Sequence, residues 1–312
     1  MADYSVIIPV YDEAETIRPL WERLEKVISE TGKDFEVIFV DDGSSDGSLE
    51  IIDEISVADA RVKYISFGVN KGKSAVYSVA FQYASGNVII TIDADLQDHP
   101  EEIPTLIEKL KQYDLVIGRK SGRLKNEPLK SVPSKFFNLM KRHIFGLVVH
   151  DSNCGLKAMK REVADSLHLY GDLYRFIAEM SYASGFKITE IPVEHSPRLH
   201  GKSKYGISRF NTGLMDILTV KFLISFSTKP LHFFGGITLL LLLAGSGLEI
   251  YALIMKISGS NFRTHIAAII VGIMLIIVGV QLLCVGLLGE MFVRFSKTPG
   301  RFRIKRKKGF DN

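Results

Sequence analysis

Residues 88–98 read Val88-Ile-Ile-Thr-Ile-Asp93-Ala94-Asp95-Leu-Gln97-Asp98, an apolar run that ends in carboxylates. Similar short runs, rich in Val and Ile, occur at 4–10, 35–40, 62–67 and 115–117, and helical patterns of apolar residues separate them. Strands that alternate with helices predict an α/β fold with a mainly parallel sheet covered by helices on both faces. Ligands of such sheets bind at the carboxyl ends of the strands, so the polar residues that follow each strand are the candidates for function.

Three polar clusters follow predicted strands: Pro9-Val-Tyr11-Asp-Glu13, Asp41-Asp42-Gly-Ser-Ser-Asp46 and 93–98. Capping of the next helix explains Asp46 but not Asp93-x-Asp95. At a breaking strand end these two carboxylates can face one crevice, and such oxygen-rich groups suit Mg²⁺ or Mn²⁺, which bridge carboxylates to a diphosphate. A lone Asp-x-Asp is a weak signal, and its coincidence with two other polar strand ends strengthens it.

Several enzyme classes are disfavoured by spacing. Gly72-Lys73-Ser74 would need a glycine at position 67 to form a phosphate-binding loop, and that position is Phe67. No Gly-x-Gly-x-x-Gly follows the first strand and no Gly-x-Ser-x-Gly occurs, which argues against a dinucleotide oxidoreductase and an esterase. The two cysteines, Cys154 and Cys284, cannot form a disulfide framework.

The C-terminal third has the pattern of a membrane hairpin. No charged residue occurs in 230–248 or in the 24 residues 266–289, and the second run reaches ~36 Å as a helix, enough for a bilayer. Residues 294–312 carry a net charge of +7, which leaves −3 for the rest of the chain. A basic run beside an apolar segment indicates the cytoplasmic end of a span rather than nucleic-acid binding. Two buried helices of a soluble core are the weaker alternative.

These patterns predict a multi-pass protein of the cytoplasmic (inner) membrane. We expect a cytoplasmic catalytic head, an interfacial amphipathic helix, a first span, a short extracytoplasmic turn, a second span and a basic cytoplasmic tail, at 1–206, 207–229, 230–255, 256–265, 266–293 and 294–312. Packing of 207–229 against the sheet is an equal alternative to an interfacial position. Glycines in both spans would allow close helix approach and a homo-oligomer.

Five motifs together resemble the inverting family 2 glycosyltransferases of the polyprenyl-phosphate hexosyltransferase type. This group includes the dolichol-phosphate mannose synthases and the bacterial undecaprenyl-phosphate glucosyltransferases of the GtrB type. The resemblance covers nearly the whole chain and rests on Val-Ile-Ile-Pro9-Val-Tyr-Asp-Glu13, Asp41-Asp42-Gly-Ser, Asp93-Ala-Asp95-Leu-Gln97-Asp, Asp151-Ser-Asn-Cys-Gly155-Leu-Lys157 and Arg198-Leu-His-Gly201-Lys-Ser203-Lys204-Tyr205.

The resemblance implies a head of glycosyltransferase A-type, Rossmann-like fold that binds a nucleoside diphosphate sugar and uses Mg²⁺ or Mn²⁺. Asp95 and Gln97 would hold the metal, and Asp95, Asp151 and Arg198 would be catalytic. The donor would contact Pro9, Tyr11, Glu13, Asp41, Asp42, Lys73, Asp93, Ala94 and Arg119. The acceptor phosphate would contact Lys130, Ser134, Arg198, Lys202, Ser203 and Lys204.

The implied reaction transfers a hexose from a nucleoside diphosphate sugar to a polyprenyl phosphate with inversion at the anomeric carbon. UDP-glucose and undecaprenyl phosphate are the expected substrates, and GDP-mannose is the second choice of donor. A processive polysaccharide synthase is disfavoured because its Gln-x-x-Arg-Trp motif is missing, the only tryptophan being Trp21. A non-catalytic membrane scaffold with a nucleotide-sugar-binding head remains the alternative from another class.

Overall fold

The computed structural model describes residues 2–120, 144–147, 149–196, 217, 219–222, 230–259, 262–295 and 304–309. The chain forms two compact units, one of 1–220 with 300–312 and one of 221–299. The first unit, called the head below, contains the predicted head 1–206 and also 207–220 and 300–312. Of the predicted amphipathic segment 207–229, only 217 and 219–222 belong to the described part, and they are helical.

The head contains an eight-stranded sheet in the described residues, ordered β7-β5-β6-β4-β1-β2-β3-β8. The strands are β1 (Tyr4–Val10), β2 (Phe35–Asp41), β3 (Val62–Phe67), β4 (Val88–Thr91), β5 (Leu115–Lys120), β6 (Lys157–Lys160), β7 (Ile188–Val193) and β8 (Ile304–Lys308). Strands β3, β2, β1 and β4 are neighbours and run parallel, so their carboxyl ends meet at one edge. The prediction of a mainly parallel α/β sheet is confirmed, with β6 and β8 as antiparallel members.

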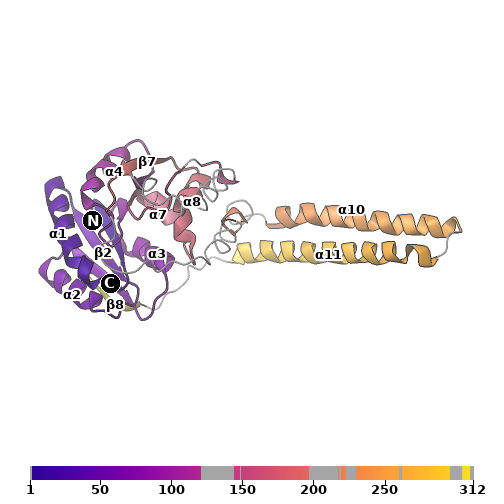
Figure 1. The fold of residues 1–312 in the computed structure, drawn as a ribbon, viewed down its shortest axis with the longest axis horizontal. Helices are drawn as coiled ribbons and strands as arrows, with labels where there is room; N and C mark the ends of the chain where they lie inside the picture. Colours follow the sequence, from indigo (N-terminus) through magenta and orange to yellow (C-terminus); the bar gives the residue numbers. More distant parts are fainter. Residues whose placement is uncertain are drawn as a thin grey trace. The chain divides into compact units, whose positions relative to one another are not determined.

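Helices cover both faces of this sheet (Figure 1). Helices α1 (Ala14–Thr31) and α2 (Ser48–Ala58) lie on one face, and α3 (Lys73–Tyr83) and α8 (Ile177–Ala183) on the other. The remaining short helices are η1 (Pro100–Glu102), α4 (Ile103–Lys109), α7 (Arg161–Ser166) and η2 (Leu173–Phe176). Strand β2 is buried along its whole length, as expected for a strand covered on both faces.

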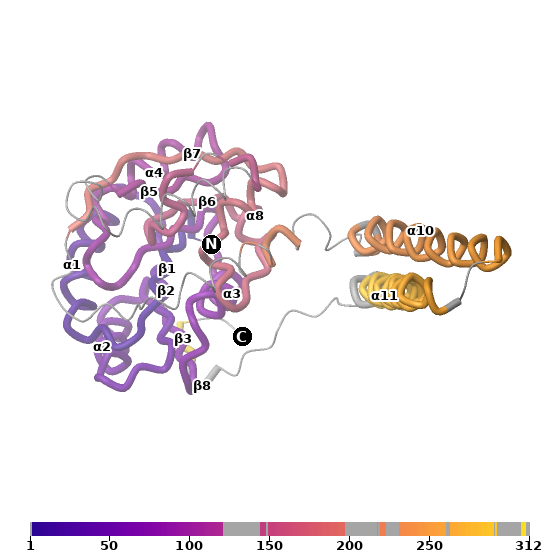
Figure 2. Tube along the Cα trace, turned by 45° about the vertical axis from the view of Figure 1, so that its right-hand side comes forward, coloured from indigo at the N-terminus to yellow at the C-terminus, as the bar shows by residue number. Residues whose placement is uncertain are grey.

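Strand β8 comes from the basic C-terminal run and pairs antiparallel with β3 (Figure 2). Lys308 Nζ lies 2.9 Å from Asp53 Oδ1 of α2, and Lys307 Nζ lies 5.4 Å from the centre of the Tyr83 ring of α3. The two lysines thus reach helices on opposite faces of the sheet. The sequence analysis placed 294–312 in a tail and did not predict this strand.

The second unit is a pair of apolar helices, α10 (Pro230–Ile257) and α11 (Phe262–Phe295), which lie side by side (Figures 1 and 2). Both are long and apolar enough to cross a membrane, and few of their residues are buried within the chain. Glycines let them approach closely: a Cβ on Gly245 would lie 2.7 Å from the Gly272 carbonyl oxygen. The helices run further than predicted, so only 258–261 separate them.

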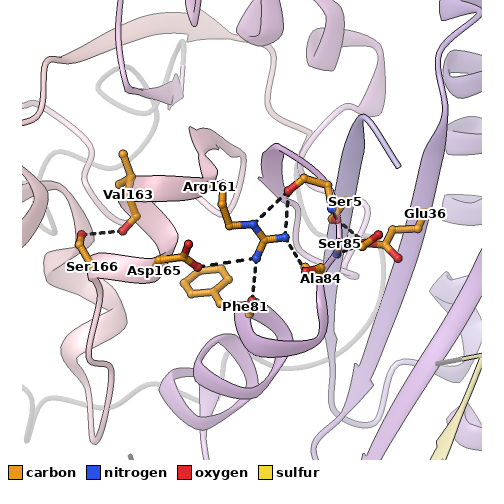
Figure 3. A network of polar contacts seen from close by, with 10 residues as sticks. Ser5, Glu36, Phe81, Ala84, Ser85, Arg161, Val163, Asp165 and Ser166 are labelled. Carbon is orange, nitrogen blue, oxygen red and sulfur yellow. Dashed lines mark hydrogen bonds and ion pairs between the residues drawn. The ribbon is translucent and has the colours of Figure 1, made fainter. Parts of the chain in front are cut away.

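A polar network fastens α7 to the end of α3 (Figure 3). The Arg161 guanidinium donates hydrogen bonds to the carbonyl oxygens of Phe81, Ala84 and Gly86. These carbonyls lie at or beyond the C-terminus of α3, where no further helical N–H is available to them. Arg161 therefore fixes the helix whose first residue, Lys73, faces the candidate site.

We predict that Arg161→Leu lowers the stability of the head, because it leaves buried carbonyl groups without donors. The expected loss is about 3 kcal/mol, or a fall of about 6–12 °C in the melting temperature. Trp21, the single tryptophan, is only 9% exposed and reports unfolding of the head by its fluorescence. Arg18→Gln, in an exposed pair with Glu54, is the control and should change little. Equal melting temperatures for both variants would contradict the assignment.

Candidate active site

A cavity of about 320 Å³ lies at the carboxyl ends of β1 to β4. Among the described residues that line it, eight were predicted to bind the donor or the metal, namely Pro9, Tyr11, Glu13, Asp42, Lys73, Asp93, Ala94 and Asp95. The other lining residues are Val10, Asn70, Gly72, Val76, Asp172, Tyr174 and Arg175. Residues from distant parts of the chain meet here because four parallel strands end at the same edge.

The loops after β1 and β2 hold each other in place. Asp12 has a positive φ of 53°, its N–H donates to Ser44 Oγ, and its carboxylate accepts from the Ser45 N–H. The Asp46 carboxylate accepts from the N–H groups of Ala14 and Ser48, the first residues of α1 and α2. Gly47 is the N-cap residue of α2, and Asp46, one residue earlier, accepts from the first N–H of α2 and from that of α1.

The paired aspartates after β2 have different positions. The Asp42 carboxylate accepts from the N–H groups of Lys71, at 2.7 Å, and Gly72, at 2.9 Å, and it lines the cavity. Burial raises the pKa of Asp42, against the effect of these hydrogen bonds. Asp41 was predicted to contact the donor, but it is 1% exposed and outside the lining. Its carboxylate accepts from Ser44 N–H and Ser66 Oγ, so it serves the loop instead.

Asp93 and Lys73 form an ion pair at the floor of the cavity, with Lys73 Nζ 2.5 Å from Asp93 Oδ1. Burial opposes the charge on each group, and the partner's charge outweighs it. The pKa of Lys73 is consequently raised well above its usual range, and that of Asp93 is lowered. The carboxylate was predicted to contact the donor, and in the structure it pairs with the Lys73 ammonium.

The other side of Asp93 rests against the turn before β6. A Cβ on Gly155 would lie 2.3 Å from Asp93 Cγ, so only glycine fits there. Thr91 Oγ1 donates to the Gly155 carbonyl oxygen at 2.7 Å, and the Lys157 ammonium donates to the Cys154 carbonyl oxygen. Lys157 is 3% exposed; burial lowers its pKa, and Lys73 adds to the effect. Burial also raises the pKa of the Cys154 thiol to about 12, so this cysteine is not a thiolate nucleophile.

The predicted metal residues follow β4. Asp95 lines the cavity, and Leu96 has a φ of 59°, an uncommon conformation for a residue with a bulky side chain. The Gln97 side-chain N–H donates to the Ser196 carbonyl oxygen, so a metal would be met by its amide oxygen. No group of three His, Cys, Asp or Glu side chains in the described residues is placed to hold a metal. Mg²⁺ commonly takes one or two protein carboxylates and substrate phosphates, so the residues fit an ion that shares the donor's diphosphate.

Arg119 was predicted to contact the donor, and in the structure its side chain is exposed and lies outside the described lining of the cavity. Its neighbour Lys120 points the other way, because side chains alternate along a strand. Burial raises the pKa of Asp93, and the charges of Lys73, Lys157 and Lys120 lower it, in that order. Lys120 is therefore the β5 cation whose charge acts on Asp93, and Arg119 lies outside the described lining of the cavity.

Asp151 begins the turn before β6 and does not line the cavity. Its N–H donates to Glu190 Oε1 at 2.8 Å, and its carbonyl oxygen accepts from the Cys154 N–H. The predicted acceptor residues Lys130, Ser134, Arg198, Lys202, Ser203 and Lys204 lie outside the described residues. Ser196, just before that last segment, is described: its N–H donates to the Gln97 carbonyl oxygen.

One wall of the cavity, called the η2 wall below, was not predicted from the sequence. Asp172, Tyr174 and Arg175 come from η2 and the residue before it, and the Tyr174 N–H donates to Ser74 Oγ of α3 at 3.0 Å. No strand precedes these residues, so the rule that looks for polar strand ends could not find them. The sequence signal for an anion site here is weak: it consists of Tyr174 and Arg175 close to the acidic Asp172.

Comparisons with known proteins agree with this geometry. Residues 5–167 match the family Glycosyl transferase family 2. Dodecaprenyl-phosphate galacturonate synthase of Rhizobium johnstonii is 30% identical over 94% of this chain and 88% of its own length. Undecaprenyl-phosphate 4-deoxy-4-formamido-L-arabinose transferase of Salmonella paratyphi B is 30% identical over 93% of this chain and 88% of its own.

A solved structure has the same fold at lower identity. Glucosyl-3-phosphoglycerate synthase from Mycobacterium tuberculosis, in complex with Mn²⁺ and UDP-glucose, superposes with a TM-score of 0.52 and 18% identity, over 70% of this chain and 79% of that one. This likeness bears on the fold alone. The family match over half of the chain and the full-length relatives establish that this chain belongs to glycosyl transferase family 2.

Proposed function

We propose that this protein transfers a hexose from UDP-glucose to undecaprenyl phosphate at the cytoplasmic face of the membrane, with inversion at the anomeric carbon. The observation that carries the proposal is the cavity, which combines Tyr11 and Asp42 at the ends of β1 and β2 with Lys73 and Asp95 beside them. One part suits a nucleoside and the other a diphosphate. Relatives over the full length are named for sugars carried on dodecaprenyl or undecaprenyl phosphate.

The chemistry needs little proton transfer. A lipid monophosphate has a second pKa near ~6, so at neutral pH it is largely a dianion and already a nucleophile. Its oxygen attacks the anomeric carbon, the bond from that carbon to the diphosphate oxygen breaks, and UDP leaves with the electron pair. A single displacement inverts the configuration. Mg²⁺ or Mn²⁺, held by Asp95 with Gln97, would supply positive charge to the leaving diphosphate.

The hairpin topology has support that does not depend on charge counting. Residues before α10 and after α11 belong to one folded unit. If both helices cross a bilayer, the two flanking segments must then lie on the same side of it. The excess of Lys and Arg in 294–312 makes that side the cytoplasm.

A panel of nucleotides tests the donor. With Mn²⁺ present, UDP and UDP-glucose should raise the melting temperature of the detergent-solubilised protein more than GDP and GDP-mannose do. UDP-galactose and UDP-galacturonate test the sugar, which the relatives' names leave open. Stabilisation by GDP and not UDP would overturn the choice of nucleoside, and no stabilisation by any nucleotide would contradict a nucleotide-sugar-binding head, whether catalytic or not.

We predict that Asp95→Asn lowers turnover by about 10²–10³-fold, because the diphosphate loses charge stabilisation as it leaves. The assay is transfer of labelled sugar to undecaprenyl phosphate in micelles, with Mn²⁺ or with excess EDTA. Glu54→Gln, which changes an exposed carboxylate outside the cavity, is the matched control and should keep full activity. Near-normal turnover of the wild-type protein in EDTA would refute the metal assignment.

We predict that Asp151→Asn lowers turnover by at least about ten-fold while the affinity for UDP stays unchanged. Asp151 lies outside the donor cavity, so its proposed role is to orient the acceptor directly or through a cation. Titration with UDP and the transfer assay measure the two effects separately. Asp34→Asn is an exposed control. If Asp151→Asn chiefly reduces the yield of folded protein, its role is confined to the turn.

A further inference from the structure

The η2 wall of the cavity, Asp172, Tyr174 and Arg175, carries a guanidinium that the sequence analysis did not assign. Arg175 Nε donates to Tyr174 Oη at 3.2 Å, and Arg175 Nη2 lies 3.3 Å from Asp172 Oδ2. The Arg175 side chain is 18% exposed. Two neighbours on its own segment therefore fix its orientation before any ligand arrives.

Arg175 and Lys73 both lie close to the aromatic ring of Tyr174. Arg175 Cζ lies 5.5 Å and Lys73 Nζ 5.6 Å from the centre of the Tyr174 ring, both within the range of cation–π attraction. Lys73 in turn holds Asp93, two residues before Asp95. The guanidinium is thus tied to the part of the cavity where a metal-bound diphosphate is expected.

The carboxylates that line the cavity make the positive charge of Arg175 important for binding an anionic ligand. Among the described residues, the lining carries five carboxylates, those of Glu13, Asp42, Asp93, Asp95 and Asp172, and two cations, Lys73 and Arg175. A nucleoside diphosphate is itself an anion, so it can settle only where positive charge is concentrated. Lys73 pairs with Asp93 at 2.5 Å, and Arg175 lies 3.3 Å from Asp172, whose side chain is 48% exposed.

We propose that Arg175 binds the diphosphate of the donor and that Tyr174 and Asp172 position its guanidinium. This inference rests on the proposed function, since it needs a nucleoside diphosphate as ligand. A guanidinium has five donors in one plane, so it can keep its two neighbours and still offer an edge to phosphate oxygens. Because this charge belongs to the protein, its contribution to binding does not require the metal.

The test compares UDP with uridine, which lacks phosphate, on the full-length protein in detergent. Arg175→Gln should weaken UDP binding by about 10–100-fold, the loss of a charge-assisted contact. It should leave uridine binding within about two-fold, and the loss for UDP should persist in EDTA. Arg175→Lys should recover part of the affinity, because it keeps the charge without the planar fork. Arg23→Gln, in an exposed pair with Glu101, is the control.

Other outcomes are equally decisive. Equal losses for UDP and uridine would mean that Arg175 only shapes the wall, and unchanged UDP binding would remove it from the site. Either result would leave the proposed function intact, provided that the wild-type protein binds UDP and transfers sugar. If the wild type prefers GDP, the proposed donor is wrong, and the same ratio measured with GDP and guanosine then decides the role of Arg175.

Discussion

The carboxylate of Asp93 is the contact on which the rest of the site depends. It follows the end of β4, pairs with the ammonium of Lys73 at the start of α3, and lies against the backbone of Gly155 before β6. Three segments distant in sequence are thereby fixed to one another at the floor of the cavity. A half-buried ion pair of this kind contributes less by its own energy than by the geometry it imposes.

Positive charge around Asp93 is arranged in layers. Lys73 faces the cavity, and Lys157 lies beneath it, buried and held by the Cys154 carbonyl oxygen. Lys120 adds a third cation from β5, and its charge is felt at Asp93. These three cations lower the pKa of Asp93 against the effect of burial, so the carboxylate keeps its charge in a buried position. Lys73 also brings positive charge into the cavity, which suits the phosphates of the proposed donor.

How far the sequence predicts this molecule depends on the range of the interactions involved. Strands β1 and β3 were predicted residue for residue, because alternating strands and helices leave a local pattern of Val and Ile. The clustering of Tyr11, Asp42 and Asp95 followed from the rule that parallel strands end at one edge. Asp41 and Arg119 lie outside the described lining of the cavity, and the sequence could not foresee this because the direction of a side chain at a strand end depends on a one-residue register. The η2 wall could not be predicted from local patterns, because contacts with α3, about 100 residues earlier in the chain, bring it to the site.

Strand β8 gives the order of synthesis a role in folding. It pairs with β3, yet it is made about 240 residues later, after both apolar helices. At 5–20 residues per second the edge of β3 stays open for roughly 12–50 s on the ribosome. An unpaired edge of Val, Tyr, Ile and Phe invites pairing with another nascent chain. Insertion of α10 and α11 as a hairpin would return the chain to the side of the membrane where β3 lies. Strand β8 could then pair with β3 soon after its synthesis, before a strand of another chain takes its place.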